Sequence, residues 1–491
     1  MRYNVQQAVI MYLKAFFEPK LAQYSYLLGC PGVGEAIVVD ASRDVEGYIR
    51  EAASQGMRIV AVTETHIHAD YLSGSRELAH RTGARLYLSN EGGEEWKYDF
   101  ASEPNVTLLH DGCRIEVGGI QVQAIHTPGH TPEHLVFLVT DTSASAETPV
   151  ALLTGDFVFV GDVGRPDLLE RAAHYRGTME PGARNLYRSL QKLGDLPDSL
   201  LILPAHGAGS ACGKSLGGVP FSTLGYERRV NWALRASTED GFVSEVLAGQ
   251  PEPPKYFAQM KRLNKLGPDA FGERAFPVRK PGSALREAME QGAIAVDIRL
   301  DAEFAQAHVP GSLNIPLYSG FPTYAGWVLP YDRPIVLIAQ DQESVRQAVR
   351  DLSLIGLDRV DAWFGVDAVY GLARNGETLG SIGSLSTVEA AERAARGDLC
   401  LLDVRGATEF EGGYIPHAQH VPYGYLWDRR DEVPLGKPVA AYCTGGGRSP
   451  VACSLLKLMG VREVFNVPGG FQEYASLGLP VASPESAATP T

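Results

Sequence analysis

The stretch "THIHADY" (65–71) combines residue types that bind metal ions in proteins. His66 and His68 are separated by a single residue, and Asp70 and Tyr71 follow closely. Imidazole nitrogens and carboxylate oxygens are common ligands of zinc and iron, so the pattern predicts a metal site. Tyr71 is a poor substitute for an imidazole, because its phenol is neutral at pH 7. The stretch leaves two alternatives open: a two-metal hydrolytic site, or one metal with open coordination positions.

Three further candidate ligands follow in the first half of the chain. They are His130 in "TPGHT", Asp156 in "TGDFVFVGDVGRPD" and His206 in "PAHG". His66, Asp156 and His206 each come after a short apolar run that is typical of a strand. Loops at strand ends often carry binding sites, because the sheet holds them rigidly. Histidines and a carboxylate in such loops strengthen the prediction of a metal centre.

Alternating strands and helices must position these residues. The predicted strands are 36–40, 58–62, 85–89, 121–125, 150–154 and 201–204. Helical patterns fall at 45–56 and 73–83. The first half of the chain is therefore expected to be an α/β domain.

The composition sets bounds on fold and partners. A chain of 491 residues is expected to form about two to four domains. The net charge of -14 disfavours nucleic acid, which needs a basic surface. No apolar run is long enough to span a bilayer, and the start lacks signal-peptide features, so we expect no membrane partner. Six cysteines without a CxxC pair favour a reducing cytoplasm over a disulfide framework.

The second half contains an internal repeat after a proline-rich boundary at 251–257. Two pairs of segments correspond in the same order: 296–316 with 402–422, and 333–360 with 437–464. We interpret them as two copies of one α/β domain, divided near 375–384. The last residues, 482–491, have the composition of a disordered tail.

The loop "YCTGGGRSP" (442–450) is a second chemical signal. Cys443 ends an apolar strand, and the following loop residues open a helix: Gly445, Gly446, Gly447, Arg448 and Ser449. Glycines allow successive backbone N–H groups to form an anion-binding nest, and a helix N-terminus adds positive potential. This environment is expected to lower the pKa of Cys443 and to hold a thiolate or persulfide.

The first copy lacks this chemistry. Ala339 stands at the position of Cys443, Ser344 replaces Arg448, and the glycines are absent. Without a thiol the first copy cannot carry sulfur covalently. We expect it to serve structure, spacing or docking.

The ligand set of the first half resembles the metallo-β-lactamase fold family, specifically its glyoxalase II and persulfide dioxygenase branch. The resemblance covers about residues 10–260. The hydrolase members imply two zinc ions, the first held by three histidines and the second by Asp70, residue 71 and His206, with Asp156 bridging. The three histidines of the first ion are His66, His68 and His130. Tyr71 weakens the second site, which favours the other branch.

The dioxygenase members imply a single Fe(II) held by His66, His130 and Asp156, with zinc as an adventitious or alternative metal. The remaining members of the set would orient ligands or waters: His68, Asp70 and His206. Arg165 lies where that family contacts the thiol part of its substrate, with a surface-loop arginine as the alternative. Tyr71 is also placed among the substrate-binding candidates. Cys212, in the loop "GAGSACGKS", either relays sulfur at a pocket mouth or is a small buried side chain.

The Cys443 loop resembles the rhodanese CxxGxRS loop, in which the glycines and Ser449 bind substrate and Arg448 assists catalysis. The whole order resembles bacterial persulfide dioxygenase–sulfurtransferase fusions. It implies an αββα sandwich at 1–260, then two doubly wound rhodanese-like α/β domains, inactive at 261–378 and active at 379–491. The small-molecule partners implied are a low-molecular-weight persulfide, O₂, sulfite and thiosulfate.

Two other functions are weighed against this one. A dinuclear zinc thiolester hydrolase with an accessory sulfurtransferase is disfavoured by Tyr71. A non-catalytic sulfur carrier or scaffold is disfavoured by the full ligand set. The sequence leaves open the thiol carrier of the persulfide and the oligomeric state, including a homo-oligomer.

Overall fold

A computed structural model describes residues 11–172, 176–214, 216–272 and 275–484 of the chain. Residues 485–491 of the predicted tail therefore lie outside the described residues. The chain divides into two compact units. The first contains Met1–Arg274 with Ser353–Gly356, and the second contains Ala275–Leu352 with Leu357–Thr491.

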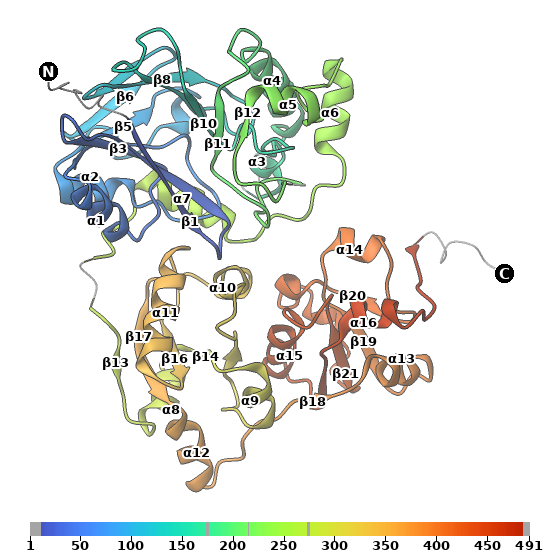
Figure 1. Cartoon of the computed structure of the whole chain (residues 1–491). Coiled ribbons are helices and arrows are strands. Elements are labelled where there is room, and N and C mark those ends of the chain that lie inside the picture. Colours follow the sequence, from blue (N-terminus) through green and yellow to red (C-terminus); the bar gives the residue numbers. More distant parts are fainter. Residues whose placement is uncertain (1–10, 173–175, 215, 273–274, 485–491) are drawn as a thin grey trace, which may run out of the picture. The chain divides into compact units, whose positions relative to one another are not determined.

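The first unit is built on two six-stranded sheets (Figure 1). One sheet has the order β1-β2-β3-β4-β5-β6, from β1 Tyr12–Glu18, β2 Gln23–Cys30, β3 Glu35–Val39, β4 Arg58–Thr63, β5 Arg85–Ser89 and β6 Val106–Leu109. The other has the order β12-β11-β10-β9-β8-β7, from β7 Arg114–Val117, β8 Ile120–His126, β9 Leu135–Asp141, β10 Ala151–Gly155, β11 Leu201–Pro204 and β12 Ser222–Thr223.

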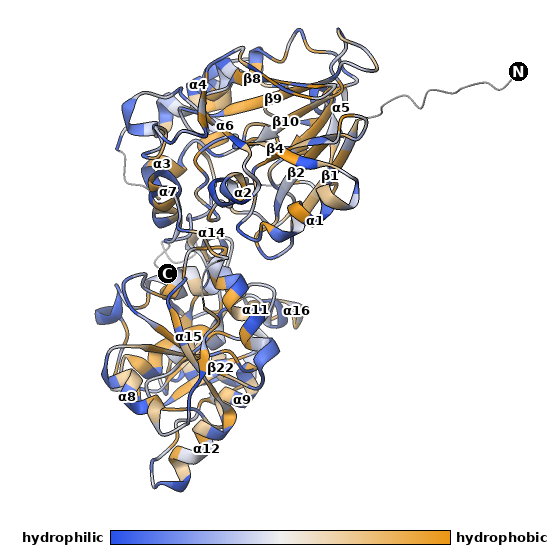
Figure 2. Cartoon of the chain, turned by 90° about the vertical axis from the view of Figure 1, so that its left-hand side faces the viewer, coloured by the Kyte–Doolittle hydropathy of each residue, from blue (hydrophilic) through white to orange (hydrophobic). Residues whose placement is uncertain are grey.

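Alternating side chains divide this unit into four layers. In β3, Ile37 and Val39 pack in the core between the sheets, whereas Val38 packs against the outer helices of the first sheet. Helices α1 (Glu46–Ser54) and α2 (Ser75–Thr82) cover that face, and α4 (Met179–Gln191) and α6 (Glu239–Leu247) cover the second sheet. In Figure 2, strand β9 is coloured as hydrophobic and the outer helix α2 largely as hydrophilic. The predicted αββα sandwich is confirmed.

Short elements complete the unit: η1 Glu94–Trp96, α3 Leu168–Arg171, α5 Leu224–Val230 and α7 Phe257–Leu266. All six predicted strands are present as β3, β4, β5, β8, β10 and β11. Strands β3, β4 and β5 run parallel, as do β10 and β11, so their carboxyl ends share an edge within each sheet. The loops that follow β4, β10 and β11 carry candidate ligands, and His130 lies in the loop between β8 and β9.

The second unit contains two five-stranded parallel sheets with the same strand order. The first copy has the order β13-β17-β16-β14-β15, from β13 Val278–Arg279, β14 Ile294–Asp297, β15 Leu313–Asn314, β16 Ile335–Ala339 and β17 Val360–Gly365. The second has the order β18-β22-β21-β19-β20, from β18 Gly383–Ser384, β19 Cys400–Asp403, β20 Gln419–His420, β21 Val439–Tyr442 and β22 Val464–Val467. The matching order confirms the internal repeat.

The helices of the two copies differ at one place. The first copy contains α8 Ala284–Glu290, α9 Asp301–Gln306, α10 Phe321–Val328, α11 Gln342–Ser353 and α12 Val366–Arg374. The second contains α13 Thr387–Ala395, α14 Ala407–Glu411, α15 Ser449–Leu458 and α16 Gly470–Ser476. In the second copy two 3-10 turns, Tyr423–Tyr425 and Arg430–Glu432, follow β20, where the first copy forms α10 after β15.

The first unit extends past the predicted boundary between residues 260 and 261. Helix α7 belongs to it because Asn264 is tied to the loop that carries the histidines. Its Nδ2 donates to the carbonyl oxygens of His68 and Tyr71, both at 2.8 Å, and its Oδ1 accepts from the Ser73 N–H. The division between residues 378 and 379 stays a prediction. No helix within the described ranges is long and apolar enough to cross a membrane.

A buried ion pair recurs at the same position in both copies. Arg299 Nη2 lies 2.6 Å from Asp297 Oδ2, and Arg405 Nη2 lies 2.6 Å from Asp403 Oδ2. All four side chains are buried. The pairs follow the equivalent strands β14 and β19 and fix the loop after each.

We expect Arg405→Met to lower the free energy of unfolding by about 3 kcal/mol, because it leaves the Asp403 carboxylate buried without its cation. Arg396→Met, which breaks the exposed Arg396–Asp398 pair, should cost less than about 1 kcal/mol. Chemical denaturation of both variants measures the difference. Equal destabilisation would mean that the buried pair does not support the loop.

Candidate metal centre and sulfur-transfer loop

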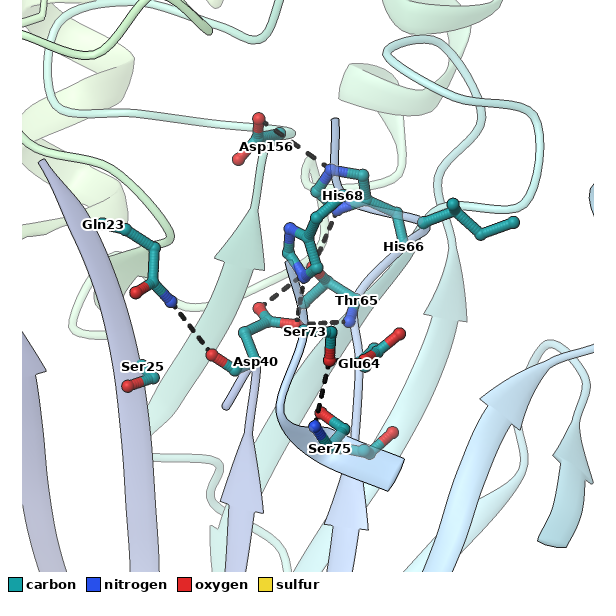
Figure 3. A network of polar contacts seen from close by, with 12 residues as sticks. Gln23, Ser25, Asp40, Glu64, Thr65, His66, His68, Ser73, Ser75 and Asp156 are labelled. Atoms are coloured by element: carbon teal, nitrogen blue, oxygen red, sulfur yellow. Dashed lines mark hydrogen bonds and ion pairs between the residues drawn. The ribbon is translucent and has the colours of Figure 1, made fainter. Parts of the chain in front are cut away.

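The predicted ligands His66, His130 and Asp156 lie together. Their ligand atoms are all within 4.8 Å of one another, and all three side chains are buried. Asp156 Oδ2 lies 3.5 Å from His130 Nε2 and 3.9 Å from His66 Nε2. Figure 3 shows Asp156 facing His66 across the site.

The histidines of this group present Nε2 to the site. His130 Nδ1–H donates to the Arg165 carbonyl at 2.9 Å, and His66 Nδ1 lies 3.0 Å from Thr65 Oγ1. Because Thr65 Oγ1 donates to Asp40, it accepts from His66, and Nε2 of each ring is left as an acceptor. Burial lowers the pKa of His66 and lowers that of His130 to about 3. Both rings are therefore neutral and able to bind a metal.

The buried polar atoms of the site fit a cation. Nε2 of His66 and of His206 and both Asp70 oxygens have no hydrogen-bond partner in the part of the chain that the structure describes. Burial raises the pKa of Asp156 to about 6. Leaving such acceptors unpaired inside a protein is costly, and a bound metal ion would satisfy them. The donor set of nitrogens and carboxylate oxygens suits iron or zinc.

A second group of donors lies beside the first, formed by Asp70, His206 and Cys212. His206 Nε2 is 3.2 Å from Asp70 Oδ2 and 3.4 Å from Asp156 Oδ1, so Asp156 faces both groups. Cys212 is only 1% exposed, so it lies inside the site rather than at a pocket mouth. Burial and the carboxylates of Asp70 and Asp156 raise the pKa of its thiol. The sequence position of Cys212 predicts a place near the site, but not its grouping with Asp70 and His206.

Tyr71 and His68 face Asp40. The Tyr71 hydroxyl donates to the Asp40 carbonyl at 3.2 Å, and its ring lies 4.5 Å from the His68 ring. His68 Nε2–H donates to Asp40 Oδ1 at 3.0 Å. Burial lowers the pKa of His68, but Asp40, Glu64 and Asp70 outweigh it and raise the value to about 9. The orienting role of His68 and substrate binding by Tyr71 both stay predictions.

Two residues that contact the metal-site groups were missed from the sequence. Asp40 has φ +56° and accepts from the Thr65 N–H at 2.7 Å as well as from His68, which Figure 3 shows. It is the last residue of the predicted strand 36–40 and directly follows β3, as Asp156 directly follows β10. His134 accepts from the Asp156 N–H at 3.1 Å and its other nitrogen donates to Thr127. Its proximity to His130 in "TPGHTPEH" was the available signal.

Arg165 is fully buried and already paired. Its Nη2 lies 2.8 Å from Asp167 Oδ2, and its guanidinium also donates to the carbonyls of Ala211 and Pro251. These contacts hold the loop that contains Arg165. The backbone carbonyl of Arg165 in turn orients the His130 ring. Binding of substrate by this guanidinium stays a prediction.

The Cys443 loop has the predicted strand–loop–helix form. Cys443 follows β21, and α15 begins at Ser449 with Pro450 in its first turn. The Gly446 N–H donates to Cys443 Sγ at 3.1 Å, and Gly446 has φ +86°, a conformation that favours glycine. A backbone donor therefore points at the sulfur, as an anion nest requires.

The Arg448 guanidinium is paired with neighbouring side chains of its own copy rather than with Cys443 Sγ. Its Nη1 and Nη2 donate to the two Glu409 oxygens at 2.6 and 2.8 Å, and Nη2 also donates to Thr444 Oγ1. Burial raises the pKa of Glu409, but the contact with Arg448 outweighs it, so the value falls to about 2. Glu409 was missed from the sequence, although Glu303 repeats it in the first copy.

The equivalent loop of the first copy is filled differently. Asp341 Oδ1 accepts from the N–H and hydroxyl of Ser344 at 2.8 and 2.9 Å, and Gln340 donates to Glu303. An acidic side chain thus occupies the helix start where the second copy has glycines. The first copy therefore lacks the glycine loop as well as the thiol, and that it carries no sulfur stays a prediction.

Asn264→Ala should weaken metal binding about tenfold to hundredfold, because Asn264 holds the carbonyls of His68 and Tyr71 and thereby the ligand loop. Chelator competition followed by metal analysis measures the change. Asn375→Ala, at the exposed end of α12, is the matched control. Unchanged metal affinity in folded Asn264→Ala would show that α7 does not support the site.

Known proteins resemble both halves of the chain. Residues 19–206 match the metallo-beta-lactamase superfamily, and residues 282–368 and 386–477 match the rhodanese-like domain. A probable metallo-hydrolase of Burkholderia pseudomallei (strain 1710b) is 29% identical over 265 residues, which cover 48% of this chain and 84% of that protein. The mitochondrial persulfide dioxygenase ETHE1 of Bos taurus is 29% identical over 235 residues, which cover 46% of this chain and 78% of that protein.

A solved structure extends the likeness. The crystal structure of a metallo-beta-lactamase from Staphylococcus aureus subsp. aureus COL is 38% identical, with a TM-score of 0.65. The match covers 72% of this chain and 99% of that one. The chain therefore belongs to the metallo-beta-lactamase superfamily and carries two rhodanese-like domains after its metallo-beta-lactamase domain.

Proposed function

We propose that the chain oxidises low-molecular-weight persulfides to sulfite with O₂ and converts the sulfite to thiosulfate. Oxidation takes place at one Fe(II) held by His66, His130 and Asp156, and sulfur transfer takes place at Cys443. The observation that carries the proposal is the buried group of two neutral histidines and one carboxylate in the same chain as a cysteine inside an anion nest. The likeness to persulfide dioxygenases supports it.

The residues of the first site each have a defined task. His66 and His130 offer Nε2, and their Nδ1 hydrogen bonds to Thr65 and Arg165 fix the ring orientation. Iron held by two histidines and a carboxylate supplies oxygen activation with positions open to substrate. The buried surroundings exclude water, and Asp70 and His206 hold polar atoms that can orient a water or proton. The reaction balances as RSSH + O₂ + H₂O giving RSH, sulfite and two protons.

The second site completes the sequence. The Cys443 thiolate attacks the outer sulfur of a second persulfide, which releases RSH and leaves a Cys443 persulfide. Sulfite then attacks the outer sulfur of that persulfide, so thiosulfate forms and the thiolate returns. The Gly446 N–H and the start of α15 stabilise the negative charge on sulfur throughout.

A second candidate function is a dinuclear zinc thiolester hydrolase. The group of Asp70, His206 and Cys212 favours it, because Cys212 supplies a donor that Tyr71 does not and Asp156 faces both groups. That function gives no role to Cys443. Metal content and oxygen consumption separate the two functions.

Anaerobically purified protein should contain about one iron per chain and consume O₂ with glutathione or coenzyme A persulfide. Asp156→Ala should lose both metal and O₂ uptake, because it removes the only carboxylate of the ligand group. Asp195→Ala, an exposed aspartate of the same unit, should retain both. Elemental analysis and an oxygen electrode give the answer. Two zinc ions per active chain, with thiolester hydrolysis and no O₂ uptake, would establish the hydrolase instead.

Cys443→Ser should still consume O₂ but release sulfite where the wild type releases thiosulfate, since serine has no thiolate at neutral pH. Cyanide-dependent sulfur transfer should disappear in the same variant. Cys400→Ser, a half-buried cysteine of the same copy, is the control. Product analysis uses a sulfite-trapping reagent. If Cys443→Ser lost O₂ uptake while keeping its iron, the two-stage mechanism would be wrong.

A further inference from the structure

Helix α10 of the cysteine-free copy lies against the Cys443 loop of the other copy, within the second unit. A Cβ atom added at Gly447 would lie 2.6 Å from the Tyr324 hydroxyl. Trp327 lies one turn further along α10 and leaves no room for a side chain at Gly424. The Trp327 ring lies 5.8 Å from the Tyr423 ring. The first copy thus places an aromatic surface on the loop of the second.

A sulfur oxyanion held at the loop can accept several hydrogen bonds. Sulfite and the sulfonate end of thiosulfate each present three oxygens to the protein. The Gly446 N–H is directed to Cys443 Sγ, and Arg448 is already paired with Glu409 and Thr444. Ser449 Oγ accepts from the Cys443 thiol at 3.7 Å. The Arg448 guanidinium and the Thr444 hydroxyl of the second copy are therefore already paired with Glu409.

The Tyr324 hydroxyl is an unused donor at the same place. Tyr324 is half-buried, and no residue in the described part of the chain hydrogen-bonds to its hydroxyl. Its ring meets Tyr423 edge-on at 6.1 Å, which fixes the ring over the loop. Burial raises the pKa of Tyr324, with Cys443 adding to the rise and Arg448 opposing it, so the phenol remains protonated.

We propose that Tyr324 completes the Cys443 site by donating a hydrogen bond to a sulfur oxyanion, sulfite or thiosulfate, held at the loop. The cysteine-free copy then has a definite role: it contributes a substrate-binding residue to the copy that carries the thiol. The absence of a side chain at Gly447 leaves room for that hydroxyl. This inference rests on the proposed sulfurtransferase function of Cys443.

The test compares Tyr324→Phe with Tyr370→Phe in the full-length, iron-loaded protein. Tyr370 is 49% exposed on α12, so its substitution removes the same hydroxyl from the same copy without touching the loop. In sulfur transfer from thiosulfate to cyanide, Tyr324→Phe should raise KM for thiosulfate about tenfold, because a hydrogen bond to a charged group is lost. The kcat and the unfolding temperature should stay close to those of the wild type, and Tyr370→Phe should change nothing.

A binding measurement keeps the test independent of turnover. Sulfite should protect Cys443 from alkylation by iodoacetamide, and Tyr324→Phe should raise the half-protecting sulfite concentration about tenfold. If the wild type transferred no sulfur but this shift remained, the proposed function would fail and the inference would stand. The inference is overturned if Tyr324→Phe matches the wild type in both assays, or if sulfite does not protect the wild type. It is also overturned if kcat falls in step with a lowered unfolding temperature, which would show a packing role.

A double substitution tests the contact itself. Gly447→Ala should also raise KM, because its methyl group displaces the Tyr324 hydroxyl. Adding Tyr324→Phe to Gly447→Ala should cause no further rise, since both changes remove one interaction. Additive effects of the two substitutions would contradict a shared interaction.

Discussion

A carboxylate buried among imidazole rings is the constraint on which the first unit depends. Asp156 lies between His66, His130 and His206, with no Arg or Lys within ion-pair distance of it among the described residues. Such a charge is expensive to bury, and a metal ion removes the cost. The edges of two sheets, α7 through Asn264 and the loop held by Arg165 all fix the groups around that carboxylate. The layers of the sandwich therefore hold the Asp156 carboxylate in rigid, buried surroundings.

The second unit shows how one fold supports two different loops. Both copies keep the buried Asp–Arg pair after the equivalent strand and the same strand order. The loops differ in their contacts: in one copy the Gly446 N–H donates to Cys443 Sγ, and in the other Asp341 accepts from the Ser344 N–H. Helix α10 of the first copy nevertheless lies against the loop that carries Cys443.

The sequence was informative where local patterns determine the structure. The six predicted strands were correct because each is an apolar run bounded by turn residues, and the ligand histidines follow those strands. The repeat was readable because its two copies align without gaps in both blocks. The loop at Cys443 was predictable for the same reason, since strand, glycines and helix start are adjacent in the chain.

Interactions between distant parts of the chain could not be predicted. Asn264 contacts a carbonyl 196 residues away, and no local pattern distinguishes it from a surface asparagine. Arg165 was expected either to contact substrate or to lie in a surface loop, but it is buried, and its partners Ala211 and Pro251 become neighbours only in the folded unit. The pairing of Glu409 with Arg448 and the placement of Tyr324 likewise depend on tertiary contacts.

The central claim is that persulfide sulfur is oxidised by O₂ at this metal centre. The most direct measurement is the stoichiometry of the full-length, iron-loaded protein: O₂ consumed against sulfite plus thiosulfate formed, with parallel anaerobic samples. The account predicts one O₂ for each sulfite formed, whether that sulfite is recovered free or as thiosulfate, and no such product without oxygen. Product formation that proceeds equally well without O₂ would contradict it.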